Sequence, residues 1–153
     1  MKKIVFMFLA IFVVLVTCSC ENDSNIKVLK CSGMNKGNNM NAYSDIEYRF
    51  KDNKLSNVVT NVTFKDIEVE NLSSIWDSIK TQFTEQNAPI EEVGYKRSVK
   101  SDDKNYSFTV TLNVDFEKIT DEIKDKYGVT YNNNMTYEEV LKKTTEDGTI
   151  TCK

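Results

Sequence analysis

Four cysteines carry the most specific chemistry in the sequence, and two of them lie near its beginning. Cys18 and Cys20 follow a stretch in which Lys2 and Lys3 precede an uncharged apolar run, residues 4–16. A basic start, a short apolar run and small residues before a cleavage point are typical of a secretory signal. A membrane-spanning helix needs about 20 apolar residues, and this run is shorter. The pattern therefore predicts export.

The cysteines at the end of this signal indicate where a lipid would be attached. Residues 16–20, VTCSC, resemble a bacterial lipobox, in which a cysteine is acylated and the signal is cut just before it. A small serine directly precedes Cys20, whereas the bulkier, β-branched Thr17 precedes Cys18. Leu15, three residues before Cys18, favours the other cysteine. We predict lipid attachment at Cys20, with Cys18 as the alternative.

The two remaining cysteines, Cys31 and Cys152, lie near the two ends of the chain that would follow cleavage before Cys20. Exported proteins meet conditions in which paired cysteines form disulfides. A bridge between these two would close a loop of about 120 residues and stabilise the fold by roughly 4–5 kcal/mol in the chain-entropy model. A redox or metal-binding thiol pair is disfavoured, because the sequence has no histidine and no CxxC spacing. A disulfide is the prediction.

Composition limits the domain organisation and the classes of partner. We expect residues 1–19 to be the cleaved signal peptide, 20–25 a lipidated tether, and 26–153 one domain, because that length ordinarily makes a single domain. Without Lys2 and Lys3 the chain has 18 basic and 23 acidic residues, a net charge of −5. An acidic chain with no basic block is a poor nucleic-acid binder. Any attachment to a membrane must then come from the acyl chains.

The remaining candidates for catalytic or metal-binding residues are carboxylates. Asp66, Glu68 and Glu70 alternate along one predicted strand and would be calcium ligands if they converged. Asp115 and Glu117 lie on the polar side of another strand, but a glycosidase needs two carboxylates facing each other across a cleft. Solvated strand faces explain both sets better. With no histidine, triads and the usual zinc sites are excluded, so we predict no catalytic residue, no metal and no cofactor.

These residues sit on a pattern that is mostly β. Residues 106–116 alternate strictly between apolar and polar, which predicts an antiparallel strand with one solvated face. It would pair with residues 92–100 as one hairpin, and residues 42–51 would pair with 55–69 as another. The apolar phase of the last run changes by one residue near Lys65, which predicts a bulge or bend there.

Helical signals follow the second of these hairpins and recur near the end of the chain. Ile75, Ile79 and Phe83 recur at helical spacing, which predicts an amphipathic helix that begins near Ser73 or Ser74 and ends near residue 86. Shorter helices are expected over residues 119–127, before a glycine, and from a capping box at residues 136–139 to about residue 145.

The predicted fold class is α+β. We expect an antiparallel sheet of about 4–6 strands built from two hairpins, with one main helix packed on one face and two short C-terminal helices. A first strand at residues 26–34 would carry Cys31, and a brief return at residues 149–152 would bring Cys152 beside it.

In the order of its segments and in their residue patterns, the chain resembles the YehR-like family of uncharacterised bacterial lipoproteins. The resemblance covers most of the residues after the signal and is carried by the following segments: the lipobox ending at Cys20, Lys30-Cys31-Ser32, Asp52-Asn53-Lys54 with the KLSNVVT strand, the helix at 74–86, residues 114–119, and Thr151-Cys152-Lys153. It implies a compact α+β domain on a lipid tether. It implies no activity, ligand or site residue.

The sequence therefore predicts the location of the protein more specifically than its molecular function. We expect a protein anchored by lipid to the outer face of the bacterial cell membrane, with a non-catalytic domain that binds a ligand, a wall component or another protein. A carboxylate- or serine-based hydrolase of the envelope and a purely structural envelope protein are the alternatives.

Overall fold

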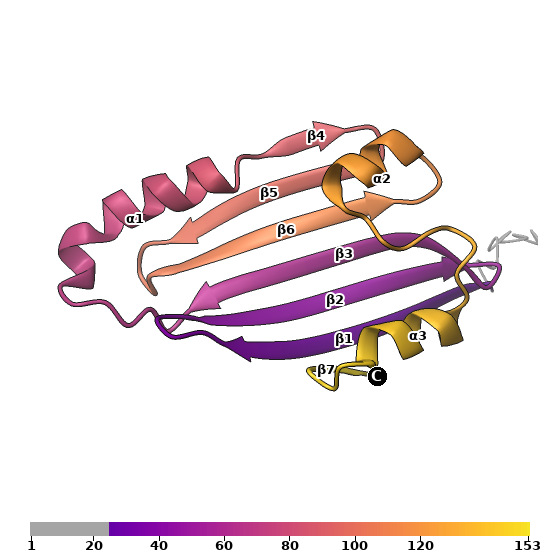
Figure 1. Cartoon of the computed structure of the whole chain (residues 1–153), viewed down its shortest axis with the longest axis horizontal. Helices are drawn as coiled ribbons and strands as arrows, with labels where there is room; N and C mark the ends of the chain where they lie inside the picture. The colour runs from indigo at the N-terminus through magenta and orange to yellow at the C-terminus, as the bar shows by residue number, and fades with distance from the viewer. Residues whose placement is uncertain (1–24) are drawn as a thin grey trace, which may run out of the picture.

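The computed structural model of the chain describes residues 25–153 (Figure 1). The predicted signal peptide, residues 1–19, lies outside the described residues. So do both candidate lipidation cysteines, Cys18 and Cys20, and all of the predicted tether except Asn25.

The described residues form one antiparallel sheet of seven strands with the order β4-β5-β6-β3-β2-β1-β7. The strands are β1 (Ile26–Lys36), β2 (Asn41–Lys51), β3 (Lys54–Lys65), β4 (Ile90–Glu92), β5 (Tyr95–Asp102), β6 (Ser107–Asp115) and β7 (Ile150–Cys152). The two predicted hairpins, β2–β3 and β5–β6, form as expected. The α+β class is confirmed, but the expected 4–6 strands are too few. The brief return strand expected at residues 149–152 is β7, and the strand that was not expected is β4, whose three residues are too few to show the alternation that identifies a strand.

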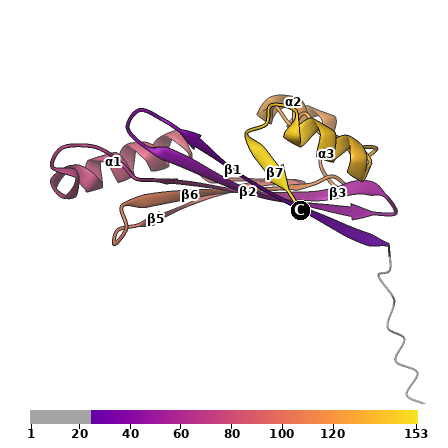
Figure 2. The ribbon, with the colours of Figure 1, turned by 90° about the horizontal axis from the view of Figure 1, so that it is seen from below.

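Three helices lie on one face of this sheet, as Figure 2 shows. They are α1 (Leu72–Gln86), α2 (Asp121–Tyr127) and α3 (Tyr137–Thr145). We call this the helix-covered face; it carries Leu29, Tyr48, Val58 and Leu112. The opposite face, here the open face, carries Lys30, Glu47, Asn57 and Asn113. The alternation in β6 explains the division, because Phe108, Val110 and Val114 are buried while Asn113 is exposed.

The helix-covered face is packed at its two ends by different segments (Figure 1). At one end α1 lays Trp76 and Phe83 on Phe108, with ring centroids 4.7 and 4.1 Å apart. At the other end, α2, α3 and the loop between them cover a larger core, in which Phe50 and Val140 are fully buried. Within the described residues, no helix is long and apolar enough to cross a membrane.

Two local predictions need correction or refinement. Of the bulge or bend expected near Lys65, the structure has no bulge: β3 ends at that residue, and the chain changes direction at Asp66, whose φ is 57°. The register shift lies instead between Arg49 and Phe50, in the pairing of β2 with β3. The first helix is not capped by a serine side chain: its N-cap is Asn71, in the left-handed conformation.

The predicted disulfide is confirmed. Cys31 in β1 and Cys152 in β7 stand opposite each other in the sheet and are joined across 121 positions of sequence. The bridge ties the end of the chain to the strand that follows the N-terminal segment. The capping box of α3 is also confirmed, with Thr136 Oγ1 accepting from the Glu139 backbone and the Glu139 carboxylate accepting from the Thr136 backbone.

Candidate functional site

The carboxylates singled out in the sequence do not gather into a site. Asp66 accepts hydrogen bonds from Asn41 and Tyr43 at 3.0 and 2.9 Å, and these bonds hold the pKa of its carboxyl below the ordinary value. In residues 25–153, no group of three or more Asp, Glu or Cys side chains could hold a metal ion, and these residues include Glu68 and Glu70.

Asp115 and Glu117 are likewise engaged locally. Asp115 is paired with Lys118 at 2.7 Å, and Glu117 lies 3.7 Å from Lys51. Both pairs are exposed ion pairs at the end of β6, of the kind that contributes little to stability. Nothing in this arrangement sets two carboxylates across a cleft.

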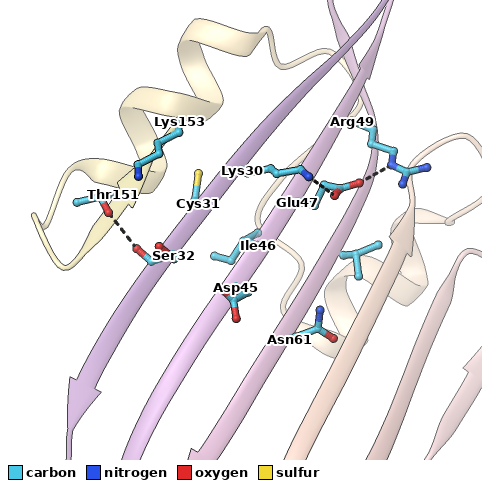
Figure 3. Close-up of a pocket in the computed structure, with 11 residues that line it drawn as sticks. Lys30, Cys31, Ser32, Asp45, Ile46, Glu47, Arg49, Asn61, Thr151 and Lys153 are labelled. Carbon is cyan, nitrogen blue, oxygen red and sulfur yellow. Dashed lines mark hydrogen bonds and ion pairs between the residues drawn. The ribbon is translucent and has the colours of Figure 1, made fainter.

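The open face carries a shallow hollow of about 540 Å³ over β1, β2 and β3 (Figure 3). At its centre, the Glu47 carboxylate forms ion pairs with two cations, at 2.7 Å from Arg49 and 3.8 Å from Lys30. Asp45, Asn61 and the end of β7 complete the wall, as the close-up shows. The two cationic side chains are more than half exposed, so water already satisfies their charge. A ligand here would have to displace that water for a small electrostatic gain.

The helix-covered face carries a groove of a different kind, about 400 Å³ in volume. Its floor is the middle of the sheet, where Ile46, Thr60 and Leu112 stand side by side on β2, β3 and β6 and are only partly buried. Its wall is the loop 128–131 together with the end of α3. The groove exists because the helices cover the two ends of the sheet and leave this apolar strip between them.

Three hydroxyl groups meet at the base of this wall. Thr144 Oγ1 donates to Tyr48 Oη at 3.0 Å, and the Tyr131 hydroxyl lies 3.2 Å from each of them. A ring in which Tyr48 donates to Tyr131 and Tyr131 donates to Thr144 uses every hydroxyl hydrogen once. Each oxygen then keeps a lone pair, so the ring can accept a further hydrogen bond but has none left to donate.

Burial is the main reason that the pKa of the Tyr48 phenol is raised well above its ordinary value, and the bond toward Tyr131 raises it further. Tyr48 therefore stays a neutral hydroxyl throughout the physiological range. At the rim of the groove, Lys143 donates to the Thr130 carbonyl at 2.9 Å and lies over the Tyr131 ring, 4.6 Å from its centroid. These contacts fix the loop as one wall of the groove.

Sequence reasoning missed this groove. Thr144 carried no signal, because it reaches Tyr48 across 96 positions of sequence. A threonine and a tyrosine so far apart can be placed together only by the tertiary fold.

Comparison with known proteins supplies no relative: no family model, no curated protein and no solved structure matches the chain.

Proposed function

We propose that the chain is a non-catalytic binding domain of the bacterial envelope, held at the outer face of the membrane by lipid on Cys20, and that it takes a small amphiphilic molecule into the groove on its helix-covered face. The resemblance to the YehR-like lipoproteins agrees with the anchor and supplies no ligand. The groove therefore carries the proposal about binding.

The observation behind this proposal is the strip formed by Ile46, Thr60 and Leu112, which is mostly apolar and only partly buried. Apolar surface removed from water contributes about 25 cal/mol per Å², so a ligand that covers this strip gains free energy that a polar hollow does not offer. Small-molecule sites are typically concave and mostly apolar, with a few polar groups that fix orientation. The hydroxyl ring of Tyr48, Tyr131 and Thr144 is such a polar group.

The same ring limits the chemistry of the ligand. The hydroxyl ring can accept a further hydrogen bond but cannot donate one. A ligand that reaches it should therefore carry a hydroxyl or amide N–H donor next to an apolar body. A monoacylglycerol has this chemistry, whereas the methyl ester of the same fatty acid has the apolar body and no donor. The two compounds form a matched pair of probes.

The groove is tested by photo-crosslinking in native membranes with a monoacylglycerol that carries a diazirine in its acyl chain. We expect labelled peptides from β2, β3, β6 and the loop 128–131. The methyl ester with the same diazirine should label them more weakly. Uniform labelling of the surface, or equal labelling by both probes, would contradict the assigned ligand chemistry.

A matched pair of variants connects the labelling to the groove. Thr60→Phe fills the floor and should reduce labelling to background. Asn113→Phe adds the same ring to the open face, beside Leu112 in sequence, and should leave labelling unchanged. If Thr60→Phe retains full labelling, the ligand does not lie in the groove.

The anchor is tested separately. Cys20→Ala should abolish the incorporation of labelled fatty acid and release the protein from the membrane fraction, whereas Cys18→Ala should leave both unchanged. Acylation that persists in Cys20→Ala and is lost in Cys18→Ala would assign the lipid to Cys18.

A further inference from the structure

Backbone groups at one edge of the sheet lack a hydrogen-bond partner within residues 25–153. Strand β7 pairs with β1 only near the disulfide, where Lys30 and Lys153 exchange backbone bonds of 3.2 and 2.8 Å. In an antiparallel sheet, residues of the same parity direct their N–H and C=O groups to the same neighbour. The backbone N–H and C=O groups of Ile26 and Val28 therefore point in the same direction as those of Lys30, but at positions that β7 does not reach.

The side chains along this edge separate apolar from charged groups. Ile26 and Val28 lie on the open face, 46% and 42% exposed, and border a hollow of about 390 Å³ that also includes Asn57. Lys27 lies on the other side, with Nζ 5.9 Å from the centroid of the Tyr137 ring. In the described part of the chain, Lys27 forms no ion pair.

A second copy of the chain is a poor occupant of this edge. Two β1 edges that pair antiparallel, using the outward groups of Ile26 and Val28, place Ile26 opposite Val28 and Lys27 opposite the same lysine of the other copy. Like charges directly opposite each other destabilise a strand pair. Any register shifted toward Lys30 collides with β7. Edge lysines are a common protection against such self-pairing.

We infer that the edge formed by Ile26, Lys27, Val28 and Leu29 is a β-strand addition site for an extended segment of a partner protein with the pattern apolar–acidic–apolar. The partner's backbone pairs with Ile26 and Val28, in line with β7. Its two apolar side chains cover Ile26 and Val28 on the open face, and its carboxylate faces Lys27. The inference is independent of the groove, because the two sites lie on different parts of the sheet.

The test uses the full chain in lipid nanodiscs, with amide hydrogen exchange followed residue by residue by NMR. The probe is the blocked peptide Thr-Val-Glu-Val-Thr. Because only the outward amides gain a partner, exchange should slow at Ile26 and Val28 and stay unchanged at Lys27, whose N–H already faces β2. The slowing should reach about tenfold when the peptide concentration is about ten times its Kd.

Two control peptides and one variant separate the contribution of the backbone hydrogen bonds from that of the charge on Lys27. The same peptide with N-methylated valines should have no effect, and a lysine in place of the glutamate should weaken binding. In Lys27→Glu, an exposed substitution, the preference should reverse toward the lysine peptide.

Three outcomes would overturn the inference. Equal slowing by the glutamate and lysine peptides would remove the role of Lys27. Slowing without peptide that appears on transfer from detergent micelles to nanodiscs would assign the edge to the bilayer. Slowing without peptide that rises with protein concentration would assign it to a second copy.

Discussion

The two ends of the helix-covered face bury their apolar residues by different means. At the α2–α3 end, the disulfide joins β7 to β1, the capping box closes the start of α3, and the hydroxyl ring ties Thr144 of α3 to Tyr48 of the sheet. At the other end, α1 begins at a left-handed asparagine without a side-chain cap, and it has no acidic residue in its first turn. It is held mainly by the stacking of Trp76 and Phe83 on Phe108.

This difference indicates which wall of the groove is rigid. The loop 128–131 and α3 belong to the tightly connected end, so they would keep the hydroxyl ring in place with or without a ligand. Regions with few buried contacts and few side-chain hydrogen bonds open at lower free energy than the rest of a protein. We therefore expect α1 to be the first element to separate from the sheet. The following predictions test this asymmetry.

The largest effect is expected at Phe108, which is 1% exposed and contacts both aromatic residues of α1. Phe108→Ala should lower the free energy of unfolding by about 3–5 kcal/mol, because it removes the stack and leaves a cavity. Chemical denaturation followed by the fluorescence of Trp76, the only tryptophan, measures it. Lys100→Ala, an exposed change on the neighbouring strand, should stay within about 0.5 kcal/mol. A loss below about 1 kcal/mol for Phe108→Ala would show that α1 is held by something else.

Loss of the disulfide should come next. The double variant Cys31→Ala, Cys152→Ala should lower the free energy of unfolding by about 2–5 kcal/mol, since the bridge closes a loop across 121 positions. In hydrogen exchange, the amides of β7 should accelerate more than those of α1. Equal acceleration in both would mean that the bridge does not preferentially stabilise the α2–α3 end.

Helix capping should differ between the two ends by a smaller amount. Thr136→Ala removes the side chain that accepts from the Glu139 backbone in the capping box and should cost about 0.5–2 kcal/mol. Ser74→Ala removes only a bond to the Asn71 carbonyl and should change stability by less than about 0.5 kcal/mol. Thermal denaturation of both variants gives the comparison. A Ser74→Ala variant at least as destabilised as Thr136→Ala would remove the capping asymmetry.

The smallest effect concerns pH. Trp76 Nε1 donates to Asp103 at 2.7 Å, and this bond, followed by that from Lys80, holds the pKa of the Asp103 carboxyl below its ordinary value of 3.8. A lowered folded-state pKa means that the contribution to stability is complete above the unfolded-state pKa and is lost as pH falls through the folded-state value. Trp76 fluorescence should therefore change in a step centred below pH 3.8, and Asp103→Asn should abolish that step. A midpoint at or above pH 3.8 would contradict the assigned bond.

Local patterns in the sequence were sufficient for the strands and helices with a clear period. The alternation around Phe108 predicted β6, and the residues at 136–139 predicted the start of α3, because both signals lie within a few neighbouring positions. The disulfide between Cys31 and Cys152 followed from counting thiols in a chain expected to be exported. The helical stripe was less accurate: Ile75 was expected on the packed side but is 38% exposed, whereas Trp76 is buried.

What the sequence determined by itself is the alternation of faces along each strand, the position of the helices and the pairing of the two cysteines. Only the tertiary structure decided that the helices cover the two ends of the sheet and leave the strip of Ile46, Thr60 and Leu112 between them. It also decided that β7 pairs with β1 beside Lys30, so that Ile26 and Val28 have a neighbouring strand on one side only within residues 25–153. The physical reason is that periodicity acts between neighbours in the chain, whereas a groove and a sheet edge depend on where distant segments pack and where they end.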